Sequence, residues 1–129
     1  MPANGRIRDF KDLEAWKQAR ELRKLAYQLA KRLPAEEKYA LGSQLRRASL
    51  SVTANIAEGF GRFSYRENIQ YCRQARASAF EIRDHLTTAY DAGYVSKKEG
   101  LAADGLAQRV IQILNGYIRS TRRREGAEG

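Results

Sequence analysis

The sequence predicts an all-α protein, one domain over residues 1–129 folded as an antiparallel up-down-up-down four-helix bundle. Three observations predict this class. Apolar residues recur at every third or fourth position in four segments, which is the spacing of amphipathic helices. No segment alternates apolar and polar residues over the length of a strand. The only two prolines are Pro2 and Pro34, so no proline interrupts a helix beyond residue 34.

The first helix is expected at about residues 13–32. Its apolar seam steps by three or four residues through Leu13, Trp16, Ala19, Leu22, Ala26, Leu29 and Leu33. Asp9 or Asp12 can cap its start. Because the residue before a proline avoids the helical conformation, this helix should end before Pro34, which is itself well placed to begin the next one.

The second helix is expected at about residues 36–59. Glu36 and Glu37 place negative charge at its electropositive start. Gly42 lies inside it at a cost of about 1 kcal/mol relative to alanine, which indicates a close approach to a neighbouring helix. Gly59 and Gly61 terminate the helix.

Two stripes with helical spacing run along this second segment. The apolar stripe consists of Leu41, Leu45, Ala48, Val52 and Ile56. The polar stripe beside it consists of Gln44, Arg47, Ser51, Asn55 and Glu58. Arg47 and Glu58 lie about 16 Å apart along a helix, so each needs a partner on another helix or chain. The polar stripe is either a buried hydrogen-bond network or a recognition surface. A structural or assembly role is favoured because a buried unpaired charge is costly.

The third and fourth helices each begin with a capping box. Ser64 and Glu67 open the third, expected at about residues 64–93, and Gly93 suits a left-handed cap at its end. Ser96 and Glu99 open the fourth, expected at about residues 96–119. The seam of the third helix contains several small residues, which predicts a near neighbour: Cys72, Ala75, Ala79, Ile82, Leu86 and Ala89.

The fourth helix has a broader apolar face than one bundle seam requires, so this face is expected to serve self-association. It consists of Leu106, Ala107, Val110, Ile111, Ile113, Leu114, Tyr117 and Ile118. The basic tail, residues 120–129, is polar and arginine-rich and is expected to fray.

Composition indicates a cytoplasmic protein with a polyanionic partner. The net charge is +9, and the 24 basic residues are 17 arginines and 7 lysines. Arginine pairs with phosphate and stacks on bases, although a GC-rich genome or a hot habitat would also enrich it. The lone cysteine, Cys72, excludes an intrachain disulfide and suggests a reducing compartment. No apolar run approaches the length of a membrane span, and Met1–Phe10 lacks the apolar core of a signal peptide, so no membrane partner is expected.

Constellations for catalysis or metal binding are missing from the sequence. We therefore expect no enzymatic activity, no metal site and no cofactor. The single histidine, His85, lies four residues after Glu81, and a solvated Glu–His pair is favoured there over a metal ligand set. Cys72 is expected to be a buried, inert thiol because it lies on an apolar seam.

The candidate polyanion surface is an arginine row on one flank of the third helix. Together with Ile69 and Phe80, the row steps by three or four through Arg62, Arg66, Arg73, Arg76 and Arg83. Such a row could follow a phosphate backbone, while Tyr65 or Tyr71 stacks on unpaired bases. The alternatives are a solvated face, or arginines that pair with carboxylates on a neighbouring helix or subunit. The tail adds Arg119, Arg122, Arg123 and Arg124, which either bind nucleic acid non-specifically or solubilise the end.

Several motifs resemble the 23S rRNA intervening-sequence, or S23, family of small bacterial four-helix-bundle proteins. The resemblance covers roughly Phe10 to Tyr117. The motifs are Phe10-x-x-Leu13-x-x-Trp16, Leu33-Pro34-x-Glu36-Glu37-x-Tyr39-x-Leu41, Gln44-Leu45-Arg46-Arg47-Ala48, Asn55-Ile56-Ala57-Glu58-Gly59, Ala77-Ser78-x-x-Glu81 and Gly93-Tyr94. The Gln-Leu-Arg-Arg and Asn-Ile-Ala-Glu-Gly motifs, in this order, are the most specific of these.

This resemblance implies a bundle that assembles into rings, often pentamers, and leaves the activity open, since most members have none established. Some members are encoded inside inserts within ribosomal RNA genes. The fold is also similar to the accessory variability protein of diversity-generating retroelements, a basic pentamer that works with a reverse transcriptase and binds nucleic acid. A reverse transcriptase is therefore a further candidate partner.

Charge, motifs and resemblance together predict a non-enzymatic homo-oligomer that binds nucleic acid electrostatically, with RNA favoured over DNA. The expected binding residues are Arg62, Arg66, Arg73, Arg76, Arg83, Arg122, Arg123 and Arg124. The alternative is a protein–protein adaptor or assembly ring without affinity for nucleic acid.

Overall fold

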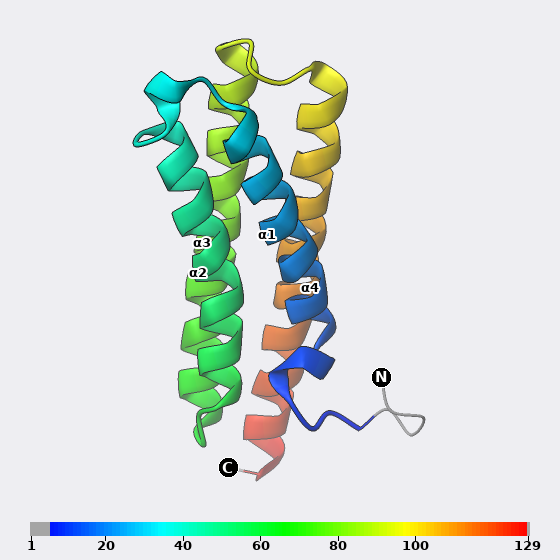
Figure 1. The fold of residues 1–129 in the computed structure, drawn as a ribbon. Coiled ribbons are helices and arrows are strands. Elements are labelled where there is room, and N and C mark those ends of the chain that lie inside the picture. Colours follow the sequence, from blue (N-terminus) through cyan, green and yellow to red (C-terminus); the bar gives the residue numbers. More distant parts are fainter. Residues whose placement is uncertain (1–5, 129) are drawn as a thin grey trace.

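The computed structural model describes residues 6–128, which fold into four α-helices and two short 3-10 turns and contain no strand. The elements are η1 (Phe10–Asp12), α1 (Glu14–Arg32), η2 (Ala35–Glu37), α2 (Leu41–Phe60), α3 (Tyr65–Asp91) and α4 (Lys97–Glu128). The four helices lie side by side, and the α1–α2 and α3–α4 connections share the end opposite the α2–α3 connection (Figure 1). The predicted all-α class is confirmed. The predicted domain and tail extend into residues 1–5 and 129, outside the described residues.

The core lies between the four helices, where the predicted seams meet. Leu22 of α1, Leu45 and Ile56 of α2, Ile82 of α3 and Leu114 of α4 are each at most 2% exposed. α2 packs between α1 and α3, and α4 packs against both α1 and α3. Every buried side-chain nitrogen and oxygen in the described part of the chain has a hydrogen-bond partner. Burial of these apolar side chains therefore leaves no polar side-chain atom of the described residues unsatisfied.

The start of α2 differs from the prediction. Residues 35–37 form the separate turn η2, and the helix begins only at Leu41 because Ala40 has a non-helical backbone. The Glu37 carboxylate accepts hydrogen bonds from the Leu41 N–H (3.4 Å) and the Tyr94 hydroxyl (2.8 Å). Gly42 therefore lies in the first turn of α2, where a Cβ would lie 3.0 Å from the Glu37 carbonyl oxygen. Its close approach is to the preceding turn and not to a neighbouring helix.

The end of α4 also differs from the prediction, because the helix continues through the basic tail to Glu128. Thr121 is fully buried, and its hydroxyl donates to the Tyr117 carbonyl (2.8 Å). The Arg124 guanidinium lies 5.9 Å from the centre of the Tyr65 ring on α3. The expectation that this tail frays was wrong, since the tail is helical as far as Glu128 and Arg124 contacts Tyr65 of α3.

The two predicted serine caps act at the starts of α3 and α4, whereas the predicted aspartate cap of the first helix does not act at α1. Ser64 Oγ accepts from the Glu67 N–H (3.3 Å), and Ser96 Oγ accepts from the Glu99 N–H (3.1 Å). Asp12 accepts from the Asp9 N–H (3.1 Å) and so caps η1, not α1. α1 begins after Leu13, without a side-chain cap.

Glu99 links the start of α4 to the end of α1. Its carboxylate accepts from the Ser96 N–H (3.2 Å) and forms an ion pair with Arg32 (2.5 Å). The hydrogen bond from Arg32, followed by that from Ser96, lowers the pKa of Glu99 from 4.5 to about 2. A carboxyl group whose pKa is lower in the folded state stabilises the fold above its unfolded pKa. This stabilisation is lost as the pH falls from about 4.5 to about 2.

Glu99→Gln should therefore flatten the acid limb of the stability profile. Urea unfolding can be monitored by circular dichroism at several pH values between about 6 and about 2. As the pH falls, the free energy of unfolding should decrease less in the variant than in the wild type. The two proteins should differ most above about pH 4.5 and converge near pH 2. Parallel profiles would show that the Arg32–Glu99 pair contributes nothing to the fold.

Candidate nucleic-acid interface

The polar stripe of α2 lies against α3. Ser51 Oγ lies 2.8 Å from Ser78 Oγ on α3. Asn55 Nδ2 donates to the Ser51 carbonyl (2.9 Å) and to its hydroxyl (3.0 Å). Because these side chains bind one another and α3, the middle of the stripe links the two helices through hydrogen bonds.

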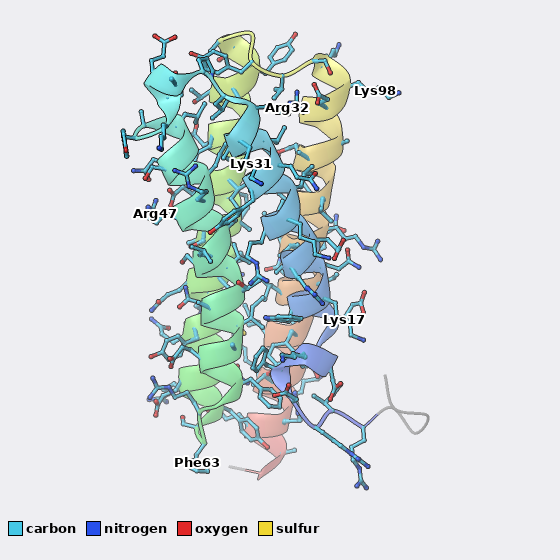
Figure 2. The ribbon with its side chains drawn as sticks, in the orientation of Figure 1. Lys17, Lys31, Arg32, Arg47, Phe63 and Lys98 are labelled. Carbon is cyan, nitrogen blue, oxygen red and sulfur yellow. The ribbon has the colours of Figure 1, made fainter. Side chains whose placement is uncertain are left out.

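One end of the stripe is a charged network. The Gln44 side-chain oxygen accepts from Arg47 Nε (3.0 Å). Arg47, labelled on α2 in Figure 2, in turn forms an ion pair with Glu81 of α3. Glu81 also lies 2.9 Å from Nε2 of His85, whose side chain is only 16% exposed. The predicted Glu81–His85 pair therefore forms, but it is largely buried instead of solvated, and Arg47 of α2 binds the same carboxylate.

The other end of the stripe surrounds Arg62. Its guanidinium pairs with Glu58 (2.9 Å), donates to the Tyr71 hydroxyl (2.6 Å) and lies 4.9 Å from the centre of that ring. Glu67 is a more distant partner, at 3.8 Å. Two carboxylates therefore oppose the charge of Arg62, so this arginine holds the α2–α3 turn.

Apart from Arg62, the arginine row divides into two groups in the structure. Arg76 donates to the side-chain oxygen of Asn115 (2.7 Å), and Arg83 pairs with Asp104 (2.7 Å), both on α4. Burial acts to raise the pKa of Asp104, but hydrogen bonds from Arg83 and Gln108 together hold this pKa below its ordinary value. Arg66 and Arg73 are exposed, and neither forms an ion pair with the described residues. The row is thus partly a seam between α3 and α4.

The helical tail brings a second set of arginines to the start of α3. Arg124 lies over the Tyr65 ring, and Asn68 Nδ2 donates to the Tyr117 hydroxyl (2.9 Å) one helical turn away. These contacts place the end of α4 beside the first turns of α3, at the α2–α3 end of the bundle (Figure 1). We call the exposed cations here the basic end: Arg66, Arg73, Arg122, Arg123 and Arg124.

The broad apolar face of α4 is mostly covered within the chain. Ala107, Val110, Leu114 and Ile118 are at most 3% exposed, while Leu106, Ile113 and Tyr117 pack at the edge of the core. The face is broad because α4 packs against two neighbours, α1 and α3, and each contact needs a seam. Within one chain, the part of this face left accessible for self-association is therefore its partly buried edge, Leu106, Ile113 and Tyr117.

The partners of these polar residues were not identified from the sequence. Ser78, Glu81 and His85 step by three and four residues along α3 and match the polar stripe of α2. This spacing was a signal that sequence reasoning did not use. Asp104 and Asn115 carry no comparable signal, because each meets a single arginine.

Other chemistries find little support in the described residues. Within residues 6–128, no three His, Cys, Asp or Glu side chains come together in a way that could hold a metal ion. Burial raises the pKa of Cys72 to about 12, so the thiol stays protonated. Among these same residues, no helix combines the length and apolarity needed to cross a membrane.

Comparison with known proteins gives a family and a fold. Residues 11–116 match the family model described as 23S rRNA-intervening sequence protein. No curated protein matches the chain. The fold is similar to a crystal structure of a protein with unknown function from the S23 ribosomal protein family of Bacteroides thetaiotaomicron VPI-5482. That match has a TM-score of 0.75 and 21% sequence identity, and covers 81% of this chain and 97% of the other.

Proposed function

The chain belongs to the 23S rRNA-intervening sequence protein family, and on that premise we propose that it is a non-enzymatic nucleic-acid-binding protein. It acts in the cytoplasm as an antiparallel up-down-up-down bundle that associates with itself, with a ring of five as the expected assembly. It binds RNA in preference to DNA, because the unpaired bases of an RNA can stack on arginine planes and tyrosine rings while its phosphates pair with the arginines. A reverse transcriptase is a further candidate partner.

The observation that carries this proposal is the basic end. Arginines from two helices converge there because the helical tail packs on Tyr65. These arginines are part of a chain whose net charge is +9, so a polyanion is the natural ligand. Arginine side chains on phosphates position a nucleic acid but do not read its sequence, so binding should depend strongly on salt and weakly on sequence.

Neutralising the basic end tests this function. The variant Arg66→Gln, Arg73→Gln, Arg122→Gln, Arg123→Gln should bind a single-stranded RNA at least about tenfold more weakly than the wild type in about 0.1 M salt. The slope of log affinity against log salt should fall in magnitude by about three, because roughly four phosphate contacts are lost at about 0.7 each. Fluorescence anisotropy over a salt series measures both quantities.

The matched control neutralises four exposed cations elsewhere on the surface, Lys38, Lys97, Lys98 and Arg109. Figure 2 shows Lys98 at the opposite end of the bundle from Phe63 of the α2–α3 turn. This control should change RNA affinity by less than about threefold, since long-range effects between exposed charges are screened. Equal losses in both variants would overturn the assignment to the basic end. A wild-type protein without salt-dependent affinity for RNA or DNA would overturn the function itself.

The second candidate function is a protein–protein adaptor without affinity for nucleic acid. It is favoured by three exposed apolar side chains on α3 and α4: Phe80 (49% exposed), Tyr90 (48%) and Leu101 (63%). Tyr90 and Leu101 line a hollow of about 370 Å³ between the two helices. Light scattering of the purified protein, with and without RNA, measures self-association separately from nucleic-acid binding.

A further inference from the structure

A second hollow, of about 360 Å³, lies between α1 and α2. It is lined by Arg23, Lys24, Tyr27 and Gln28 of α1 and by Leu50 of α2. Its volume is at the lower end of the range of small-ligand pockets, about 300–1,000 Å³. None of its lining residues belongs to the basic end, to the arginine row or to the polar stripe of α2.

The surroundings of this α1–α2 groove are almost entirely of one sign. Exposed or half-buried cations flank the groove on both helices. Four lie along α1, and one lies on α2, a helical turn before Leu50: Arg20, Arg23, Lys24 and Lys31, and Arg46. α2 carries no carboxylate from Leu41 to Ala57. Glu21 of α1 pairs with Lys24 (3.3 Å), but both side chains are more than half exposed, so this pair is weak. The groove therefore carries an excess of positive charge, of which Glu21 offsets one unit at Lys24.

The partners of two of these arginines are neutral. Arg23 donates to the Thr53 hydroxyl on α2 (2.9 Å), which holds its guanidinium across the groove without cancelling its charge. Arg46 donates to the Lys38 carbonyl (3.1 Å) in the same way. This differs from Arg62 and Arg83, whose partners include carboxylates. A positioned guanidinium with spare donors suits a phosphate oxygen.

Tyr27 and Leu50 add a flat and an apolar surface to this charge. Tyr27 is half-buried in the hollow, and Leu50 is 47% exposed on the opposite wall. A base that is not stacked on its neighbours finds a π-face at the tyrosine and an aliphatic contact at the leucine. Gln28 offers both a donor and an acceptor to the edge of such a base.

We propose that the α1–α2 groove holds one unpaired nucleotide of a single-stranded RNA. The base lies between Tyr27 and Leu50, and its phosphate lies at Arg23 and Lys24. The inference rests on the proposed nucleic-acid binding and deepens it by selecting single strands, because bases in a duplex are stacked inside and cannot enter the groove. An acidic peptide would meet the same charge but would gain nothing specific from the flat ring.

The experiment compares Tyr27→Leu, which removes the ring, with Tyr27→Phe, which keeps it. The full chain is titrated with an oligouridine of about 12 nucleotides, a duplex of equal length, inorganic polyphosphate and poly-glutamate. Tyr27→Leu should bind oligouridine about tenfold more weakly, within the range expected for one stacked base, while Tyr27→Phe stays within about twofold of the wild type. Neither change should alter polyphosphate or duplex binding.

Two further variants keep the test independent of folding defects at Tyr27. Leu50→Gln changes an exposed side chain and should weaken oligouridine binding about threefold, with an unaltered thermal transition. Arg23→Gln should lower the magnitude of the salt slope by about one.

The outcomes separate the two proposals. If the wild type binds oligouridine in a salt-dependent manner but the Tyr27→Leu and Leu50→Gln variants bind equally well, the groove assignment is wrong and the proposed function stands. If the wild type binds neither RNA nor DNA, both fail. If poly-glutamate binds as tightly as oligouridine and loses as much affinity in Tyr27→Leu, the occupant is an acidic protein segment and the nucleotide assignment is overturned.

Discussion

Gly59→Ala is expected to destabilise the protein by about 1–3 kcal/mol, the usual cost of overpacking a well-packed contact. A Cβ at this position would lie 2.9 Å from both Tyr71 Cβ and Asn68 Oδ1, and 3.1 Å from the Asn68 carbonyl oxygen. Tyr71 Cβ and the Asn68 carbonyl are rigid parts of α3, so the two helices would have to separate. Alanine's higher helix propensity, about 1 kcal/mol, offsets only part of this cost.

Gly105→Ala is the matched control, because it makes the same substitution inside α4 where a Cβ would meet nothing within 4 Å. This variant should be more stable than the wild type by about 0.5–1 kcal/mol. Urea unfolding of both variants measures the two changes. Opposite signs are expected, and a stabilised Gly59→Ala variant would show that α2 and α3 can separate at this point without loss.

The Gly59 contact also positions the candidate interface. Asn68, which the added methyl group would meet, donates to Tyr117 on α4. Tyr71, the other neighbour, accepts the hydrogen bond from Arg62. Separation of α2 from α3 would therefore disturb the contacts that place the basic end. Gly59→Ala should weaken RNA binding even though it removes no charge.

Leu114→Ala is expected to lower the free energy of unfolding by about 2–5 kcal/mol. Leu114 is completely buried on α4, within the core cluster shared by all four helices. Truncation removes apolar area from the core and leaves a cavity that packed helices fill only partly. For a domain whose total stability is about 5–15 kcal/mol, this is a large fraction.

Leu101→Ala serves as the control, since Leu101 lies on the same helix but is 63% exposed. Its effect should stay within about 0.5 kcal/mol. Chemical denaturation at one temperature compares the two variants. RNA affinity should be unchanged in Leu114→Ala wherever the variant remains folded, because the substitution is made at a completely buried residue and removes no charge. A small effect at Leu114 would mean that the core collapses into the cavity.

Helix existence and core faces followed directly from the sequence. Leu45, Ile56, Ile82 and Leu114 were each assigned to a seam, and each is buried. This succeeds because an amphipathic helix must bury its apolar stripe, whatever its neighbours are. The start of α2 and the end of α4 could not be predicted from the sequence. The start of α2 follows a turn in which Glu37 accepts a hydrogen bond from Tyr94, and the end of α4 contacts the ring of Tyr65. Both contacts join residues far apart in the chain, so the spacing within one segment could not predict them.

The candidate site shows the same division. The polar stripe was recognised on α2, but its partners Ser78 and Glu81 came only from the packing of α3 against it. The arginine row was recognised on α3, yet Arg76 and Arg83 turn toward α4 while Arg66 and Arg73 stay exposed. Helical spacing gives the face of one helix and does not say which side chains a second helix brings to it.

The sequence by itself thus determined the all-α class, the buried seams, the serine caps of α3 and α4 and the excess of positive charge. These depend on interactions within a few residues or on totals over the chain. Tertiary structure alone decided which arginines pair with carboxylates and which stay exposed without such a pair. It also formed the α1–α2 groove around Tyr27 and Leu50. The reason is physical: whether a charge is compensated depends on separations of a few ångströms between helices that are far apart along the chain.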